Sequence, residues 1–111
     1  MLSSDVLRGY NDAIILSALM DSDSYGYEIS KRIRQTSGEH YTMKETTLYS
    51  ALNRMERAGY INSYAGEITQ GKPRTYWKIT SEGMSYFADK LDEWELTQYV
   101  LNQFLIRNKE N

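Results

Sequence analysis

The stretch from Thr42 to Gly59, TMKETTLYSALNRMERAG, decides the fold of this chain, because it has the pattern of one amphipathic helix with both ends marked. Thr42 followed three residues later by Glu45 predicts a capping box at the start. Gly59 predicts a left-handed stop at the end. The apolar residues recur at the spacing of a single buried helix face, which consists of Leu48, Ala51, Leu52 and Met55.

The opposite face of this helix is made of hydrogen-bonding and basic side chains. It carries Thr46, Ser50, Asn53 and Arg57, flanked by Thr47, Tyr49 and Arg54. Side chains of these types bind base edges and phosphates, so the face is suited to reading DNA.

The charge of the chain is distributed unevenly, although its net value of -2 does not by itself suggest a polyanionic partner. Residues 25–79 hold nine basic against five acidic side chains, a net charge of +4. Residues 1–24 (one basic, four acidic) and 80–111 (three basic, six acidic) each carry -3. A basic centre between acidic ends indicates a nucleic-acid-binding face on a scaffold that faces elsewhere; the alternative is a chance distribution of charge on a mixed surface.

The segments on either side of the stretch predict a winged helix-turn-helix. Apolar residues predict a helix from Asp5 to about Met20, and a second helix is expected to begin with Ser24 as its cap. A turn over 35–41 joins that helix to the one at Thr42. Residues 60–65 and 74–79 alternate like strands, and they predict a hairpin whose tip spans 66–73. Lys72 and Arg74 are placed where such a wing would meet the phosphate backbone.

The end of the chain predicts one long helix, capped by Thr80 and running to about Arg107. Its apolar residues follow a heptad seam with one polar position, Gln98, which is able to fix register. A small monomer can hardly cover such a band, so we expect two copies to pair through it; the alternative is that the band packs wholly on its own domain. The seam consists of Met84, Phe87, Leu91, Trp94, Gln98, Leu101 and Leu105.

Trp94 lies on the predicted dimer seam and has two interpretations. It either packs as part of the seam or, if the two copies splay apart, lines an apolar cavity suited to planar aromatic ligands.

An enzyme is disfavoured by what the sequence lacks. There is no cysteine and only one histidine, so a Cys nucleophile and a Cys- or His-rich metal site are both excluded; we expect no metal and no cofactor. The acidic cluster Asp89, Asp92, Glu93 and Glu95 is expected to be a solvated helix face. His40 is expected to be a solvated loop side chain, with a phosphate contact as the alternative. Because there is no long apolar run and no signal-peptide pattern, we expect a cytoplasmic protein without membrane association.

Several short motifs in order resemble the PadR family of bacterial transcriptional regulators, specifically its compact type, which includes a multidrug-sensing repressor. The motifs cover most of residues 10–95: Tyr25-Gly-Tyr-Glu-Ile29; Thr47-Leu-Tyr49 with Leu52, Arg54, Met55, Gly59 and Tyr60; and Gly71-Lys-Pro-Arg74 with Tyr76, Ile79, Thr80 and Gly83. One departure is Ser50, where many relatives carry proline, and it makes base preference hard to transfer.

The resemblance implies a homodimer that binds inverted-repeat promoter DNA, usually as a repressor released by a small molecule. It places the Thr46–Asn53 face in the major groove and Lys72 and Arg74 on adjacent phosphates. It also implies that Trp94, eleven residues after Gly83, lines a ligand pore at the dimer centre.

The sequence therefore predicts a mainly α fold with a small β-hairpin: a winged helix-turn-helix over 1–79 and a C-terminal dimerisation helix over 80–108. The expected partners are a palindromic double-stranded operator, a second copy and a planar aromatic effector. The alternative is a winged-helix protein interaction module that binds no DNA. The predicted DNA contacts are Lys44, Thr46, Thr47, Tyr49, Ser50, Asn53, Arg54, Lys72 and Arg74.

Overall fold

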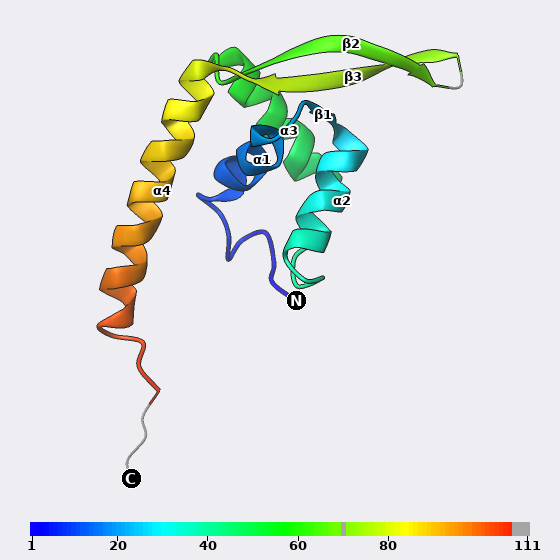
Figure 1. The fold of residues 1–111 in the computed structure, drawn as a ribbon. Coiled ribbons are helices and arrows are strands. Elements are labelled where there is room, and N and C mark those ends of the chain that lie inside the picture. Colours follow the sequence, from blue (N-terminus) through cyan, green and yellow to red (C-terminus); the bar gives the residue numbers. More distant parts are fainter. Residues whose placement is uncertain (70, 108–111) are drawn as a thin grey trace.

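The computed structural model describes residues 1–69 and 71–107, and it has the predicted winged helix-turn-helix architecture. Figure 1 shows three helices gathered beneath the base of a hairpin, with the hairpin reaching out to one side and the last helix leading away on the other. This mainly α arrangement confirms the predicted fold class. The elements are α1 (Asn11–Met20), β1 (Ser24–Tyr25), α2 (Gly26–Thr36), α3 (Glu45–Arg57), β2 (Ile61–Thr69), β3 (Lys72–Ile79) and α4 (Ser81–Asn102).

The core is formed where α1, α2 and α3 meet one face of the sheet. The four apolar residues predicted for the buried face of α3 are all at most 3% exposed. From the other elements, the core includes Ile15, Leu16 and Leu19 of α1, Ile29 and Ile33 of α2, and Ile61, Trp77 and Ile79 of the sheet.

The two predicted ends of α3 have different outcomes. Gly59 has a φ of +86°, which confirms the left-handed stop. The capping box is wrong, because α3 begins at Glu45 with Lys44 at the cap position and no side-chain cap bond. The cause is the preceding segment, in which Tyr41 and Met43 are both buried at 2% exposure. Burying every second residue requires an extended backbone, so Thr42 lies outside the helix.

The predicted starts of the first two helices are also wrong. α1 begins at Asn11 rather than Asp5, because Gly9 has a φ of +96° and the residues before it form successive tight turns. Ser24 is not a helix cap, because it pairs as a strand with Trp77. Tyr25 takes the cap position of α2 with extended dihedrals and no side-chain cap bond. The Ser24 hydroxyl instead donates to the Glu28 carboxylate.

The sheet has the order β1-β3-β2 with antiparallel pairing throughout. The hairpin strands are longer than predicted, since β2 and β3 continue through most of the expected tip over 66–73, with a register shift between Ala65 and Ile68. Two tip residues remain: Gly71 has a φ of +80°, and residue 70 lies outside the described residues. The irregular pairing lets Gly66 and Pro73, which disfavour regular strands, be accommodated within the wing.

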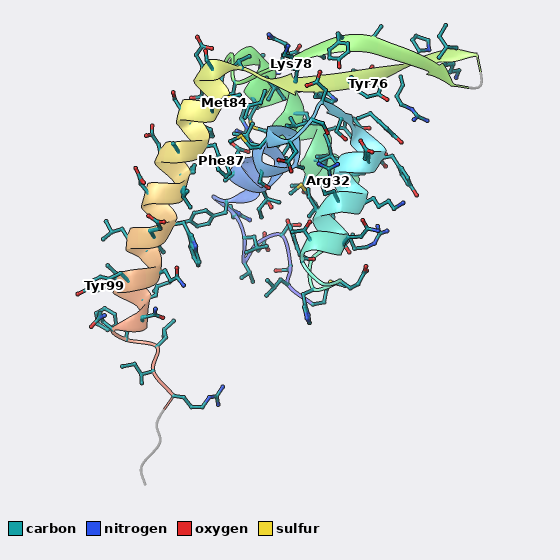
Figure 2. All side chains as sticks on the ribbon, viewed as in Figure 1. Arg32, Tyr76, Lys78, Met84, Phe87 and Tyr99 are labelled. Carbon is teal, nitrogen blue, oxygen red and sulfur yellow. The ribbon has the colours of Figure 1, made fainter. Side chains whose placement is uncertain are left out.

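The start of α4 confirms the predicted cap, because the Gly83 amide donates to the Thr80 hydroxyl oxygen at 3.0 Å. The helix ends at Asn102, not near Arg107, so Leu105 follows the helix and is 74% exposed. The last position of the predicted range 80–108 lies outside the described residues. Figure 2 shows Phe87 on the side of α4 that faces α1, and Tyr99 farther along, beyond the compact part of the molecule. Among residues 1–69 and 71–107, no helix is both long and apolar enough to cross a membrane.

Candidate nucleic-acid interface

The polar face of α3 is open to solvent along its length. Thr46, Ser50, Asn53 and Arg57 are all exposed, as is Lys44 at the start of the helix. Thr47 is half-buried and borders the same face. The packing of the opposite, apolar face fixes this row of hydroxyl, amide and basic groups outward.

Tyr49 packs on the first turn of α2 instead of pointing freely outward. A Cβ atom at residue 26 would overlap the Tyr49 hydroxyl, so only glycine allows this close approach. Tyr49 remains 40% exposed. The contact joins α3 to α2, and it explains why a glycine stands at position 26 opposite Tyr49.

Arg54 is engaged inside the protein. Its two terminal nitrogens donate to the two carboxylate oxygens of Asp12 at 2.7 and 2.8 Å, which links α3 to α1. The Tyr86 hydroxyl of α4 donates to the same carboxylate at 3.3 Å. The hydrogen bonds that Arg54 donates to Asp12 raise the pKa of Arg54 above its ordinary value, and burial raises the pKa of Tyr86, helped by the Asp12 charge. A DNA contact by Arg54 stays a prediction, and the structure gives this residue a second role as a tether.

The wing places its two predicted contact residues in different surroundings. Lys72 is exposed at the start of β3. Arg74 is half-buried, and its guanidinium carbon lies 4.0 Å from the centre of the Tyr25 ring. A hollow of about 320 Å³ lies beside Arg74, at the place where the wing meets both helices of the helix-turn-helix. It is lined by Tyr25, Gly26, Tyr27, Tyr49, Arg74, Thr75 and Trp77.

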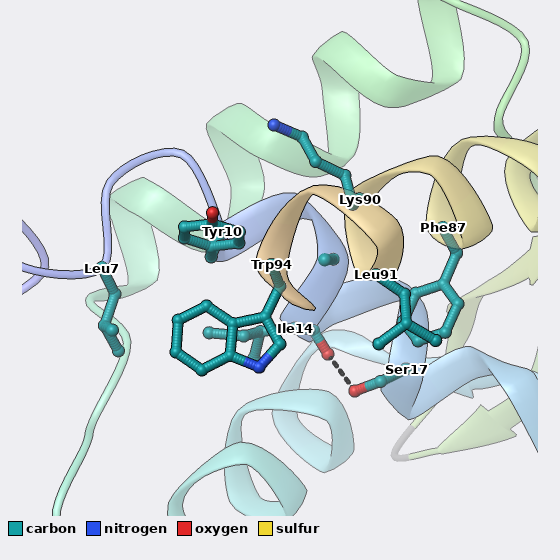
Figure 3. A pocket seen from close by; sticks show the side chains of 9 residues that line it. Leu7, Tyr10, Ile14, Ser17, Phe87, Lys90, Leu91 and Trp94 are labelled. Atoms are coloured by element: carbon teal, nitrogen blue, oxygen red, sulfur yellow. Dashed lines mark hydrogen bonds between the residues drawn. The ribbon is translucent and has the colours of Figure 1, made fainter. Parts of the chain in front are cut away.

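A separate apolar groove of about 320 Å³ lies between α1 and α4. Figure 3 shows the Trp94 indole at its centre, next to Tyr10 and Ile14, with Phe87 and Leu91 on the adjoining turns of α4. The Tyr10 and Trp94 rings meet edge to face with centroids 5.7 Å apart, and Trp94 is 43% exposed. The structure therefore gives Trp94 a partly open apolar setting, away from the exposed face of α3.

The residues of α4 at and near this groove differ in charge and exposure. Lys90 lines it and is hydrogen-bonded to Glu93 at 3.0 Å, which raises the pKa of Lys90. All four residues of the predicted acidic cluster are exposed, which confirms that they form a solvated face. The predicted dimer residues have separate environments: Phe87 is half-buried on the core, whereas Leu91, Gln98 and Leu101 are exposed.

Three residues that shape these sites are not predicted from the sequence. In the sequence Asp12 is only one of the acidic residues near the N-terminus, and no local motif links it to Arg54, which lies 42 positions away. Tyr10, which faces Trp94, lies within a predicted helix that does not form at that position. Tyr25 is expected in the first turn of a helix. The one available signal is the Tyr25-Gly-Tyr sequence, because a glycine near a helix start between two aromatic residues indicates close packing.

Comparison with known proteins agrees with this architecture. Residues 15–89 match the sequence model of the transcriptional regulator PadR-like family. A transcriptional regulator from Clostridium thermocellum is 57% identical, with a TM-score of 0.88 over 96% of this chain and 100% of that one. A PadR family transcription regulator from Clostridium difficile is 40% identical, with a TM-score of 0.76 over 88% and 100% of the two chains. Bacillus subtilis PadR in complex with operator DNA shares the fold at 19% identity, with a TM-score of 0.67 over 87% of this chain and 60% of that one.

Proposed function

This chain belongs to the transcriptional regulator PadR-like family, and from that premise we propose that it binds an inverted-repeat operator in double-stranded DNA as a homodimer and represses transcription there. The observation that carries the proposal is the outward row of polar and basic groups on α3, together with Lys72 and Arg74 on the wing that follows it. A neighbour with the same fold, Bacillus subtilis PadR, has been crystallised with operator DNA. The alternative is a winged-helix module that binds protein instead of DNA, and it predicts an apolar or acidic exposed face on α3.

The proposed contacts divide by chemistry into base-reading and phosphate-binding groups. Thr46, Thr47, Ser50 and Asn53 carry the hydroxyl and amide groups proposed to read base edges in the major groove. Tyr49 is proposed to join them only with the part of its side chain that its contact with Gly26 leaves exposed. The proposed phosphate contacts are Lys44, Arg54, Lys72 and Arg74. Arg54 is proposed to bind phosphate only through the guanidinium N–H groups that are not hydrogen-bonded to Asp12.

The direct test selects duplex DNA from a random-sequence library with the wild-type protein and measures its affinity for Lys72→Ala and Arg74→Ala. Removing one phosphate contact should weaken binding and reduce the slope of log affinity against log salt by about one. Lys78→Ala is the matched control, since Lys78 is an exposed cation on the same strand but outside the proposed contact set. Failure to select any duplex would refute DNA binding. Unchanged affinity and slope in both wing variants would remove the wing from the mechanism.

The homodimer is supported by the second half of α4 and the residues after it, which a single copy leaves uncovered. Among the residues of the predicted seam, Trp94, Leu101 and Leu105 are 43%, 44% and 74% exposed. Burying such side chains is worth about 1.5–3 kcal/mol each, enough to drive association. We propose that the interface is formed by Phe87, Leu91, Trp94, Gln98, Leu101 and Leu105. Sedimentation of the full chain tests whether the protein is a homodimer, and a monomer at micromolar concentration would refute the proposed dimer.

A planar aromatic effector is the proposed ligand of the Trp94 groove, where an indole and a phenol ring already meet. Trp77 is only 5% exposed, so saturable quenching by a bound ligand should report mainly on Trp94. Quenching by a panel of planar aromatic compounds in the Trp77→Phe variant tests the assignment; absence of quenching by the whole panel would refute it. Release of DNA by a quenching compound would establish the regulatory role.

A further inference from the structure

The face of the sheet turned away from the core carries three tyrosines in a row. Tyr76 of β3 is paired with Tyr25 of β1 on one side and with Tyr64 of β2 on the other. The Tyr25 and Tyr76 ring centroids are 5.5 Å apart, and those of Tyr64 and Tyr76 are 5.8 Å apart. The row, which we call the tyrosine stack, spans all three strands; the Tyr64 and Tyr76 rings are stacked, and the Tyr25 ring is tilted by 59° to that of Tyr76.

The two-residue period of a strand explains why the stack is separate from the core. Ser24 and Trp77 face inward, at 1% and 5% exposure. Their neighbours Tyr25 and Tyr76 therefore face outward. Tyr25 is also the cap residue of α2, so its backbone belongs to the helix-turn-helix.

The far end of the stack is fixed as well. The Tyr64 hydroxyl donates to the Asp23 carboxylate at 2.6 Å, which ties β2 to the segment just before β1. Gly66 lies against the Tyr76 ring so closely that any Cβ there would overlap it. The wing is thus held to the start of α2 by side chains and by the short β1-β3 pairing.

Arg74 lies at the near end of the stack. It is two residues before Tyr76 on the same face of β3, and its guanidinium carbon is 4.0 Å from the Tyr25 ring centre. A carboxylate partner, such as the one Arg54 has, would neutralise the charge. An aromatic ring contacts the face of the guanidinium and leaves the N–H groups at its edge able to bind phosphate.

We infer that Tyr25 is a positioning residue for DNA binding: its ring holds the Arg74 guanidinium and fixes where the wing presents this cation relative to α2 and α3. The inference rests on the proposed function, because it requires Arg74 to contact DNA. It differs from a simple stabilising role, because it couples Tyr25 specifically to Arg74.

A double-mutant cycle with the full-length protein and the selected duplex tests the inference. Tyr25→Leu removes the ring and should weaken binding about two- to fivefold per protomer, the range expected for an exposed cation–π contact. Tyr25→Phe keeps the ring and should bind like the wild type. In the Arg74→Ala background, Tyr25→Leu should have no further effect.

Tyr64→Leu is the matched control, since it makes the same change at the opposite end of the stack. It should lower the thermal midpoint, and its effect on affinity should add to that of Arg74→Ala without coupling. All affinities are measured where circular dichroism shows each variant folded. Suppose that Arg74→Ala weakens binding as proposed. The inference is then overturned if Tyr25→Leu binds DNA with wild-type affinity, or if the effects of Tyr25→Leu and Arg74→Ala on affinity are additive. An Arg74→Ala variant that binds as well as the wild type overturns the wing contact itself.

Discussion

The ion pair between Asp12 and Arg54 predicts an asymmetric response to truncation. The Asp12 side chain is 12% exposed and the Arg54 side chain 56%. Asp12→Ala leaves a guanidinium that water can reach, so the loss should be about 1–2 kcal/mol after allowing for solvent screening. Arg54→Ala leaves a mostly buried carboxylate without its cation, which should cost about 2–4 kcal/mol. The more exposed residue should therefore be the more sensitive one.

Thermal unfolding followed by circular dichroism measures this difference. At about 4 °C per kcal/mol for a chain of this size, the midpoint should fall by about 4–8 °C in Asp12→Ala and by about 8–16 °C in Arg54→Ala. The double variant should be more stable than Arg54→Ala alone, because the stranded carboxylate is then gone. Protein concentration must be fixed, since association of copies shifts the midpoint. Equal losses in the two single variants, or strict additivity in the double variant, would refute the reasoning.

Three further predictions concern the contacts that surround α3 and α4. Gly83→Ala should destabilise the protein by at least about 2 kcal/mol in denaturant unfolding, because the new methyl would overlap the backbone carbonyl of Tyr60, which cannot move aside. Gly26→Ala should also destabilise, and a second substitution, Tyr49→Phe, should restore part of the loss, because the hydroxyl makes the closest overlap. Acid unfolding should involve Glu82, whose pKa is lowered by a hydrogen bond from its own backbone amide and by the Ser81 hydroxyl. Its contribution to stability is present above the unfolded pKa and is lost as pH falls through the lower folded value, so stability below about pH 5 should depend less on pH in Glu82→Gln.

Predictions from the sequence succeeded where a local signal had no competitor. The apolar spacing of α3 names its buried residues, since a 3.6-residue period on one side is enough to orient a helix. The Thr80 cap and the Gly59 stop are likewise local, each set by a side chain or a dihedral within a turn of the helix end.

Two of the errors arose where packing or pairing overrode a local preference. Ser24 has the chemistry of a helix cap, but pairing with Trp77, 53 positions later, draws it into the sheet. Thr42 and Glu45 have the pattern of a capping box, yet burial of Tyr41 and Met43 keeps that segment extended. The contacts of Asp12 with Arg54 and of Tyr25 with Arg74 join residues on different elements. No spacing rule reveals such pairs, because they depend on how the elements pack.

The structure also shows how a chain with a net charge of -2 can present a cationic face. Among the described residues in the middle of the chain, Arg34 and Arg54 pair with the carboxylates of Glu39 and Asp12, and Arg32 donates to the Ala18 carbonyl. The exposed cations near α3 and the wing include Lys44, Arg57 and Lys72, and Tyr25, the aromatic neighbour of Arg74, carries no charge that would neutralise it. The acidic residues of α4 lie on another element. Local placement of charge, and not its sum, therefore decides which surface a polyanion would meet.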